Sequence, residues 1–157
     1  MIDRGKPETA TIDVTSMGNA IIDVLWQAPE TYIGEYALSK GTMTLIDEER
    51  AEFLTGVMGD DKLLESGGSA GNTAVGVAAL GARSAYVGKV KNDILGTAFK
   101  DSLTATGAHY DVPFSHEGPT TARCLIFVTP DGQRTMNTYL GASTRLAPSD
   151  IDEDLIA

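Results

Sequence analysis

A pair of glycines, Gly67-Gly68, opens a segment of small residues that passes through Ser69 and Asn72 and stops at Gly81. Glycines before a helix allow close approach to the backbone, and the N–H groups of a first helical turn can donate to a ligand's oxygens. The segment therefore predicts either a cradle for hydroxyl or phosphate groups or a tight loop that lets a helix pack closely on a sheet. Composition alone leaves both interpretations open.

Two common phosphate-binding loops do not match this segment. A Walker loop requires Gly-Lys-Ser/Thr, and the Rossmann fingerprint requires spaced glycines followed by an acidic residue. Neither pattern is present between Gly67 and Gly81. The sequence therefore does not predict a P-loop or a Rossmann dinucleotide-binding loop in this segment.

Strands and helices are expected to alternate around the glycine pair. Asp47 is a predicted N-cap with acidic residues after it, and Asn92-Asp93 is a second helix start. The alternation favours an α/β class with a parallel layer. The expected strands are Thr11 to Met17, Ala20 to Trp26, Gly41 to Ile46, Ser84 to Gly88 and a short one around Tyr110 to Val112; the expected helices are Pro29 to Leu38, Glu48 to Met58, Ala70 to Leu80 and Ile94 to Thr106.

The segment after Thr120 has a different pattern. Arg123 to Thr129 is rich in strand-forming residues, Pro130-Asp131-Gly132 is a turn sequence, and Arg134 to Leu140 resumes the strand pattern. We therefore expect a β-hairpin in a small antiparallel sheet that projects from the layer. The closing segment, Pro148 to Ile156, carries the signals of a further helix start.

Charge and composition limit the classes of partner. The chain has 157 residues, 42% of them hydrophobic, which is enough for one domain with a core. Its formal net charge is -10, so it repels phosphate backbones and anionic lipid surfaces. Nucleic acid and membrane partners are disfavoured.

The cysteine and histidine content points to a reducing compartment. Cys124 has no second cysteine to pair with, and His109 and His116 form no dense ligand cluster, so no metal site is predicted. The start, Met1 to Ala10, is polar, and the small apolar stretch Ala74 to Ala82 is too short to span a bilayer. We expect a soluble cytoplasmic protein.

Several of these residues together resemble a known family. Gly67-Gly68 with Asn72, Gly81, and then Val87-Gly88-Lys89-Val90 with Asp93 and Gly96 are similar to the first signature of ribokinase-like, or PfkB-type, kinases. The resemblance extends to Gly18-Asn19-Ala20-Ile21-Ile22-Asp23 and to the hairpin Thr121 to Gly141. Lys91 departs from the signature, which commonly has glycine there. The Gly-Gly-Ser-x-x-Asn and Gly-Asn-x-x-x-Asp forms look more like adenosine kinases than ribokinases proper.

This resemblance implies a fold and an activity. The fold is ribokinase-like: part of a central parallel sheet flanked by helices, with a small antiparallel β lid built from about residues 18–46 and 120–141. Residues 1–157 would be the N-terminal substrate-binding and lid portion of that fold. The activity would be transfer of a phosphoryl group from ATP, with Mg²⁺, to a primary hydroxyl of adenosine or a sugar.

The resemblance also assigns substrate contacts. Asp23 would hold the ribose 2′ and 3′ hydroxyls, since a carboxylate can accept from two vicinal hydroxyls in charge-assisted bonds. Gly67, Gly68 and Ser69 would lie beside the sugar, while Asn19 and Asn72 can both donate and accept as sugar recognition needs. Alone, an aspartate after an apolar run is more often a turn or surface group, and its combination with Gly67 and Gly68 favours the binding site.

Other positions carry weaker expectations. Ile21 and Leu45, with Met43 beside them, would face a planar base, although core packing is the competing interpretation. In the hairpin, Arg123 is expected to be solvated on an exposed strand, and Cys124 to be a small core residue.

Some of the family's catalytic parts have no match here. The Gly-Ala-Gly-Asp segment, which carries the aspartate that deprotonates the substrate, does not occur in the chain, so no catalytic residue is assigned. We expect, in this order, a truncated part of a longer kinase, a protein whose ATP-binding C-terminal half comes from another polypeptide, or a fragment kept for binding. The alternative function is a non-catalytic assembly module that dimerises through the β lid.

Overall fold

The computed structural model describes residues 11–156, so the polar segment Met1 to Ala10 lies outside the described residues. Its strands are β1 (Val14–Met17), β2 (Ile21–Gln27), β3 (Met43–Leu45), β4 (Leu63–Gly67), β5 (Ser84–Val87), β6 (Ala122–Val128) and β7 (Arg134–Tyr139). Its helices are α1 (Thr31–Glu35), α2 (Glu48–Val57), α3 (Ser69–Ala79) and α4 (Ile94–Ala105), followed by short 3-10 turns. None of the described helices is long and apolar enough to cross a membrane.

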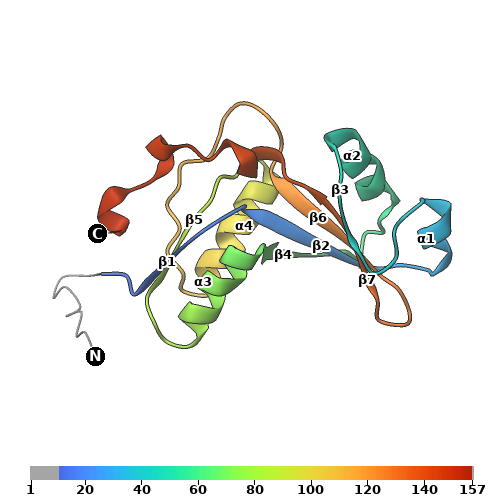
Figure 1. Cartoon of the computed structure of the whole chain (residues 1–157), viewed down its shortest axis with the longest axis horizontal. Helices are drawn as coiled ribbons and strands as arrows, with labels where there is room; N and C mark the ends of the chain where they lie inside the picture. Colours follow the sequence, from blue (N-terminus) through green and yellow to red (C-terminus); the bar gives the residue numbers. More distant parts are fainter. Residues whose placement is uncertain (1–10, 157) are drawn as a thin grey trace.

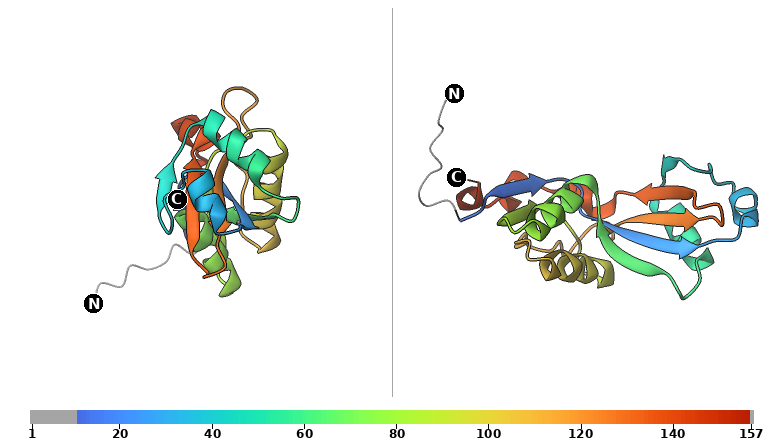
Figure 2. Two further views of the ribbon diagram at one scale, coloured as in Figure 1. Left: turned by 90° about the vertical axis from the view of Figure 1, so that its right-hand side faces the viewer. Right: turned by 90° about the horizontal axis from the view of Figure 1, so that it is seen from below.

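The strands form two sheets that follow one another along the long axis of the molecule (Figure 1). In the first sheet, β1 and β5 pair in parallel, with Val14 opposite Ser84. The second sheet has five strands in the order β3-β7-β6-β2-β4. Helix α3 packs against β1 and β5 of the first sheet, while α4 packs against β4 and β2 of the second, near the junction of the two sheets (Figure 2).

The helix starts follow from local hydrogen bonds. Asp47 caps α2 by accepting from the Arg50 N–H at 2.8 Å. Asp93 caps α4 by accepting from the Gly96 N–H at 2.8 Å, and its other oxygen accepts from the Thr121 N–H at 2.9 Å. A Cβ atom on Gly96 would lie 2.0 Å from the Lys91 carbonyl oxygen, so only glycine fits. Asp93 and Gly96 therefore join the start of α4 to the residue that precedes β6.

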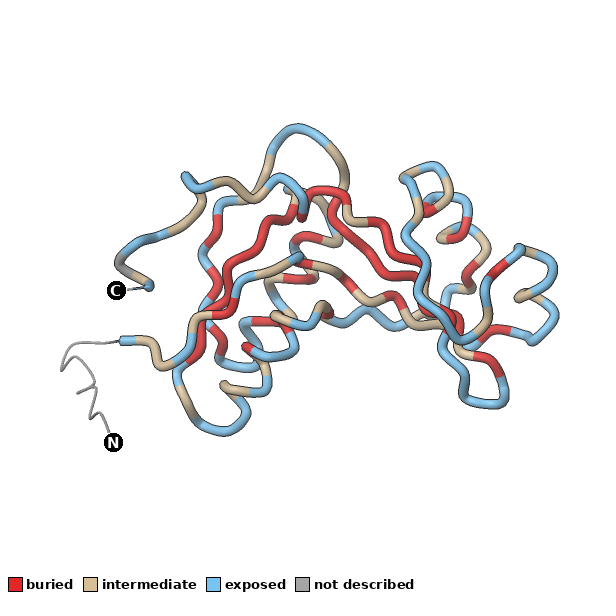
Figure 3. Tube along the Cα trace, viewed as in Figure 1, coloured by how far each residue is buried: buried red, intermediate tan, exposed pale blue. Residues whose placement is uncertain are grey.

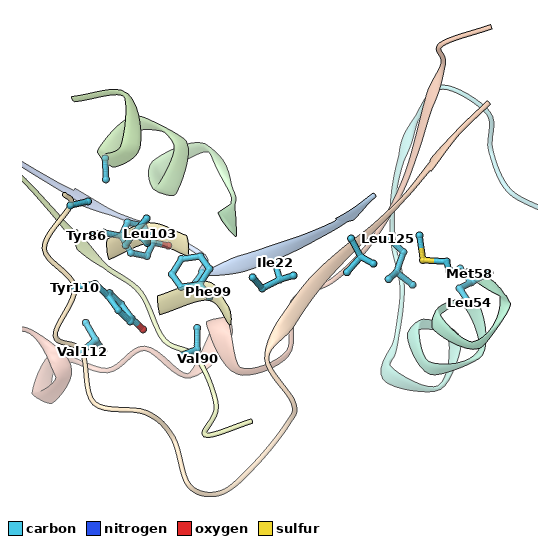
Figure 4. Packing of buried hydrophobic residues seen from close by; sticks show 14 of the residues in the cluster. Ile22, Leu54, Met58, Tyr86, Val90, Phe99, Leu103, Tyr110, Val112 and Leu125 are labelled. Carbon is cyan, nitrogen blue, oxygen red and sulfur yellow. The ribbon is translucent and has the colours of Figure 1, made fainter. Parts of the chain in front are cut away.

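Buried side chains form one continuous core that spans both sheets. Figure 3 shows buried stretches along β5, β6 and β7, while the outer sides of the helices are exposed. Tyr86, Phe99 and Leu103 pack beside the first sheet, and Leu54 from α2 packs near Leu125 of the second (Figure 4). Burying a side chain of this size contributes about 1.5–3 kcal/mol.

Most expected elements are present, but the sheets differ from the sequence-based prediction. The second sheet is mixed, because β6 pairs in parallel with β2 and β7 in parallel with β3, while the β6–β7 hairpin and the β2–β4 pair are antiparallel. It is also larger than the small antiparallel sheet expected. The hairpin inserts between β2 and β3, which sequence proximity alone does not indicate.

Two local predictions were wrong, and a third was right only in part. No strand forms over Tyr110 to Val112, where only His109 makes an isolated bridge to Ala85. Strand β4 was missed, because its first three residues lie exposed at a sheet edge and show no alternation. The closing segment does start a helix at Pro148, but only as the short 3-10 helix Pro148–Asp150, where the Asp150 carboxylate accepts from the Ala147 N–H and pairs with the Lys89 ammonium at 2.5 Å.

Candidate functional site

Asp23 in β2 and Gly67 at the end of β4 meet at the junction between the two sheets. The antiparallel pairing sets Ile21 opposite Gly67 and Asp23 opposite Glu65. A Cβ atom on Gly67 would lie 2.4 Å from both Cγ and Oδ1 of Asp23. The carboxylate thus lies directly over the Gly67 α-carbon, and any side chain at position 67 would displace it.

The Asp23 carboxylate has no hydrogen-bond or ion-pair partner among the described residues, although it is partly buried. Burial raises the pKa of Asp23, the nearby Glu65 carboxylate raises it further, and Arg134 acts in the opposite direction. A desolvated carboxylate without donors is costly, so hydrogen-bond donors from a ligand would stabilise it.

Gly68 forms the link from β4 into α3. Its φ of +82° is in the region that favours glycine, and a Cβ atom on Gly68 would lie 2.7 Å from the Asn19 carbonyl oxygen. No side chain caps α3, and the first helical bond runs from the Asn72 N–H to the Gly68 carbonyl oxygen at 2.9 Å. The N–H groups of the first turn are therefore left for a ligand or for water.

The structure brings most of the predicted residues to this junction. Asn19 lies in the bend between β1 and β2 and contacts Gly68, Ser69 begins α3, and Asn72 lies in its first turn. All three are exposed. Ile21 is partly buried and lies opposite Gly67.

Leu45 lies farther away, on the same face of the second sheet. Successive pairs across the strands place five residues in one row, and directly opposite residues share a face. Leu45 is therefore three strand intervals, about 14 Å, from Asp23. The row is Leu45, Thr138, Cys124, Asp23 and Glu65.

Sequence reasoning missed part of this row. Cys124 is buried as expected, but it is directly opposite Asp23, and its Sγ accepts a hydrogen bond from Thr138 Oγ1 at 3.2 Å. Burial raises the pKa of the Cys124 thiol to about 11, so it is neutral at physiological pH. The alternation within the hairpin gives the faces of Cys124 and Thr138, but only the pairing with β2 connects them to Asp23.

The prediction that Arg123 is solvated was wrong, because this residue is only 7% exposed. It lies opposite Ile22, on the sheet face that packs toward α2, with its guanidinium carbon 5.5 Å from the Tyr139 ring centroid. The sequence predicted helix α2, but it gave no indication of which strands this helix would cover. Arg123 is thus on the opposite face from Asp23.

Comparison with known proteins identifies the family to which this chain belongs. The model of the pfkB family of carbohydrate kinases matches residues 46–157. The chain belongs to this family. The expected α/β, ribokinase-like fold and the predicted kinase resemblance are confirmed.

Three pfkB relatives show how far the match extends. The crystal structure of adenosine kinase from Sinorhizobium meliloti superposes with a TM-score of 0.84 at 47% identity, covering 94% of this chain and 45% of that one. A fructokinase from Solanum tuberosum is 30% identical over 76% of this chain and 40% of its own length. The guanosine-inosine kinase of Escherichia coli K12 is 27% identical over 96% of this chain and 36% of its own length. The chain spans less than half the length of each relative.

Proposed function

We propose that this chain is the acceptor-binding part of an ATP-dependent kinase that phosphorylates a primary hydroxyl of a nucleoside, with adenosine as the first candidate. The observation that carries the proposal is the unpartnered Asp23 carboxylate, which lies over Gly67 beside the uncapped start of α3. Residues 1–157 then act as the substrate-binding and lid portion of a longer kinase domain. The lid elements are about residues 18–46 and 120–141, together with β4.

Asp23 accepts hydrogen bonds from two vicinal sugar hydroxyls in this proposal. Burial raises the pKa of Asp23, and the two hydroxyls replace the water that the carboxylate has lost. Asn19, Ser69 and Asn72 surround the same junction and supply further donors and acceptors. The sugar is thereby oriented by groups from two chain segments that are far apart in the sequence, residues 19–23 and 69–72.

The row of residues beyond Asp23 favours a nucleoside over a bare sugar. Cys124 and Thr138 are buried, whereas Met43 and Leu45 of β3 are 56% and 61% exposed. Exposed apolar side chains on the sugar-binding face suit a planar base attached to that sugar. A free pentose or hexose would fill only the Asp23 end. The names of the relatives include both nucleoside and sugar kinases, so this row is what supports the nucleoside.

Kinases of this family use ATP, with Mg²⁺, as the source of the phosphoryl group. Among the described residues, no group of three or more His, Cys, Asp or Glu side chains could hold a metal ion. Their part is to bind and orient the acceptor. In this proposal the nucleotide is bound by a C-terminal half supplied in cis or in trans.

The test is phosphorylation by this chain completed with a C-terminal half from the 47%-identical adenosine kinase. We expect ATP-dependent phosphorylation of adenosine in preference to fructose. Asp23→Ala should lower kcat/KM about a hundredfold or more, because two charge-assisted hydrogen bonds are lost. Asp47→Ala, which removes the N-cap of α2 and no proposed sugar contact, is the matched control. Full activity of Asp23→Ala with unaltered KM would refute the assignment.

A second candidate is a non-catalytic module that forms a homodimer through the β lid. It is favoured by the two open edges of the second sheet, where Met43, Leu45 and Leu63 are exposed. Light scattering after size exclusion should then show a dimer that Leu45→Lys and Leu63→Lys dissociate. A monomer at high concentration would remove this candidate.

A further inference from the structure

The hydroxyl of Tyr86 holds the bend that carries Asn19. Tyr86 lies in β5 and is fully buried. Its Oη donates to the Gly18 carbonyl oxygen at 2.9 Å, and the Gly18 N–H donates to the Val87 carbonyl oxygen at 3.1 Å. The Gly18 residue is therefore fixed to β5 through both its N–H and its carbonyl group.

No free space separates this bend from the candidate site. A Cβ atom on Gly18 would lie 2.8 Å from the Cβ of Ala70 in α3, and one on Gly68 would lie 2.7 Å from the Asn19 carbonyl oxygen. Close-packed backbone transmits a displacement instead of absorbing it. A shift of the Gly18-Asn19 bend would thus move Gly68 and the first turn of α3 relative to Asp23.

Tyr86 is itself held in place by neighbouring rings. Its ring centroid lies 5.6 Å from that of Phe99 and 6.0 Å from that of Tyr110 (Figure 4). A Cβ atom on Gly88 would lie 2.6 Å from Tyr86 Oη, so glycine at 88 leaves room for the hydroxyl. The Tyr86 hydroxyl therefore has little freedom to move. Tyr110 Oη, by contrast, donates to the Gly88 carbonyl oxygen at 2.9 Å and not to Gly18.

We propose that Tyr86 is a positioning residue of the acceptor site, an inference that rests on the proposed function. Its hydroxyl fixes the Gly18-Asn19 bend and, through Gly68, sets the distance between the first turn of α3 and the Asp23 carboxylate. Tyr86 does not touch the acceptor. Its effect is confined to the recognition of the sugar hydroxyls.

The test compares Tyr86→Phe with Tyr110→Phe in the full chain, titrated with adenosine and with 2′,3′-dideoxyadenosine. Both variants lose one buried hydroxyl from the same aromatic cluster, but only Tyr86 bonds to Gly18. Tyr86→Phe should bind adenosine about three- to tenfold more weakly than the unaltered chain, which is the effect of one hydrogen bond. Its affinity for dideoxyadenosine should equal that of the unaltered chain. Tyr110→Phe should leave the ratio of the two affinities unchanged. Equal weakening for both ligands, or the same ratio in both variants, would overturn the inference.

A measurement without ligand separates this inference from the proposed function. Amide hydrogen exchange at Asn19, Gly68 and Ser69 should be faster in Tyr86→Phe than in Tyr110→Phe. Unchanged exchange at these three amides would show that Tyr86 does not position the bend. If the unaltered chain binds both nucleosides equally, the role of Asp23 in the proposed function fails, and the exchange rates still decide whether Tyr86 fixes the bend.

Discussion

Strand β5 of the first sheet and the edge strand β3 of the second sheet differ in how completely they are buried. All four residues of β5 in the first sheet are buried, whereas all three residues of β3 in the second are exposed. The first sheet packs against α3, while the second contributes the row from Leu45 to Asp23. A packed framework around β5 at one end and an open edge strand at the other thus flank the candidate site, which lies where β2 and β4 meet the first sheet.

The largest effect should come from the packed end. Phe99→Ala removes a fully buried ring that contacts Tyr86 and Tyr110, and we expect it to lower the free energy of unfolding by about 3–5 kcal/mol. Leu45→Ala, in the exposed strand β3, is the counterpart and should change it by less than about 0.5 kcal/mol. Urea unfolding of both variants measures the difference. Similar losses for both would mean that β3 is covered in solution.

The junction should show an intermediate effect. Gly67→Ala places a methyl group 2.4 Å from the Asp23 carboxylate, so we expect a loss of stability of about 1–3 kcal/mol and a loss of nucleoside binding. Adding Asp23→Ala removes the clash, so the double variant should regain most of the stability but none of the binding. Stability losses that simply add would show that residues 23 and 67 do not touch.

The helix starts were easier to predict from sequence than the order of the strands. Helix starts at Asp47 and Asp93 and the glycine before α3 carry local signals, and the structure has all three. The second sheet depends on pairing between distant segments, such as Ile21 with both Gly67 and Ala122. Its strand order, the edge strand β4 and the face of Cys124 therefore had no local signal.

In the candidate site, too, some residues could be predicted from a local motif and others could not. Asp23, Gly67 and Gly68 were predicted through a motif, and the structure supplies the reason why the motif needs glycine at both positions: the Asp23 carboxylate and the Asn19 carbonyl oxygen occupy the space of a side chain. Tyr86 belongs to no such motif. Its link to Gly18 joins residues 68 positions apart and is visible only in three dimensions.

The smallest expected effect concerns the charge of Asp23. Burial, followed by the Glu65 carboxylate, raises the pKa of Asp23 above its ordinary value of 3.8, with Arg134 opposing. The folded state therefore holds the proton more tightly than the unfolded state, so the contribution of Asp23 to stability falls as pH rises from the unfolded pKa through the folded one. Above that window Asp23→Asn should be slightly more stable than the unaltered chain, by less than about 1 kcal/mol because solvent screens a partly exposed carboxylate.

Nucleoside affinity should respond to pH in the opposite direction. Affinity should increase as Asp23 ionises, because the carboxylate accepts more strongly than the acid, and this increase should vanish in Asp23→Asn. Thermal unfolding and adenosine titration at a series of pH values from about 3 to 7 test both trends, since the ordinary carboxyl pKa lies in that range. Glu65→Gln is the matched variant: it removes the neighbouring charge, so both transitions should move to lower pH. If they stay in place, Glu65 does not influence Asp23, and the raised pKa comes from burial alone.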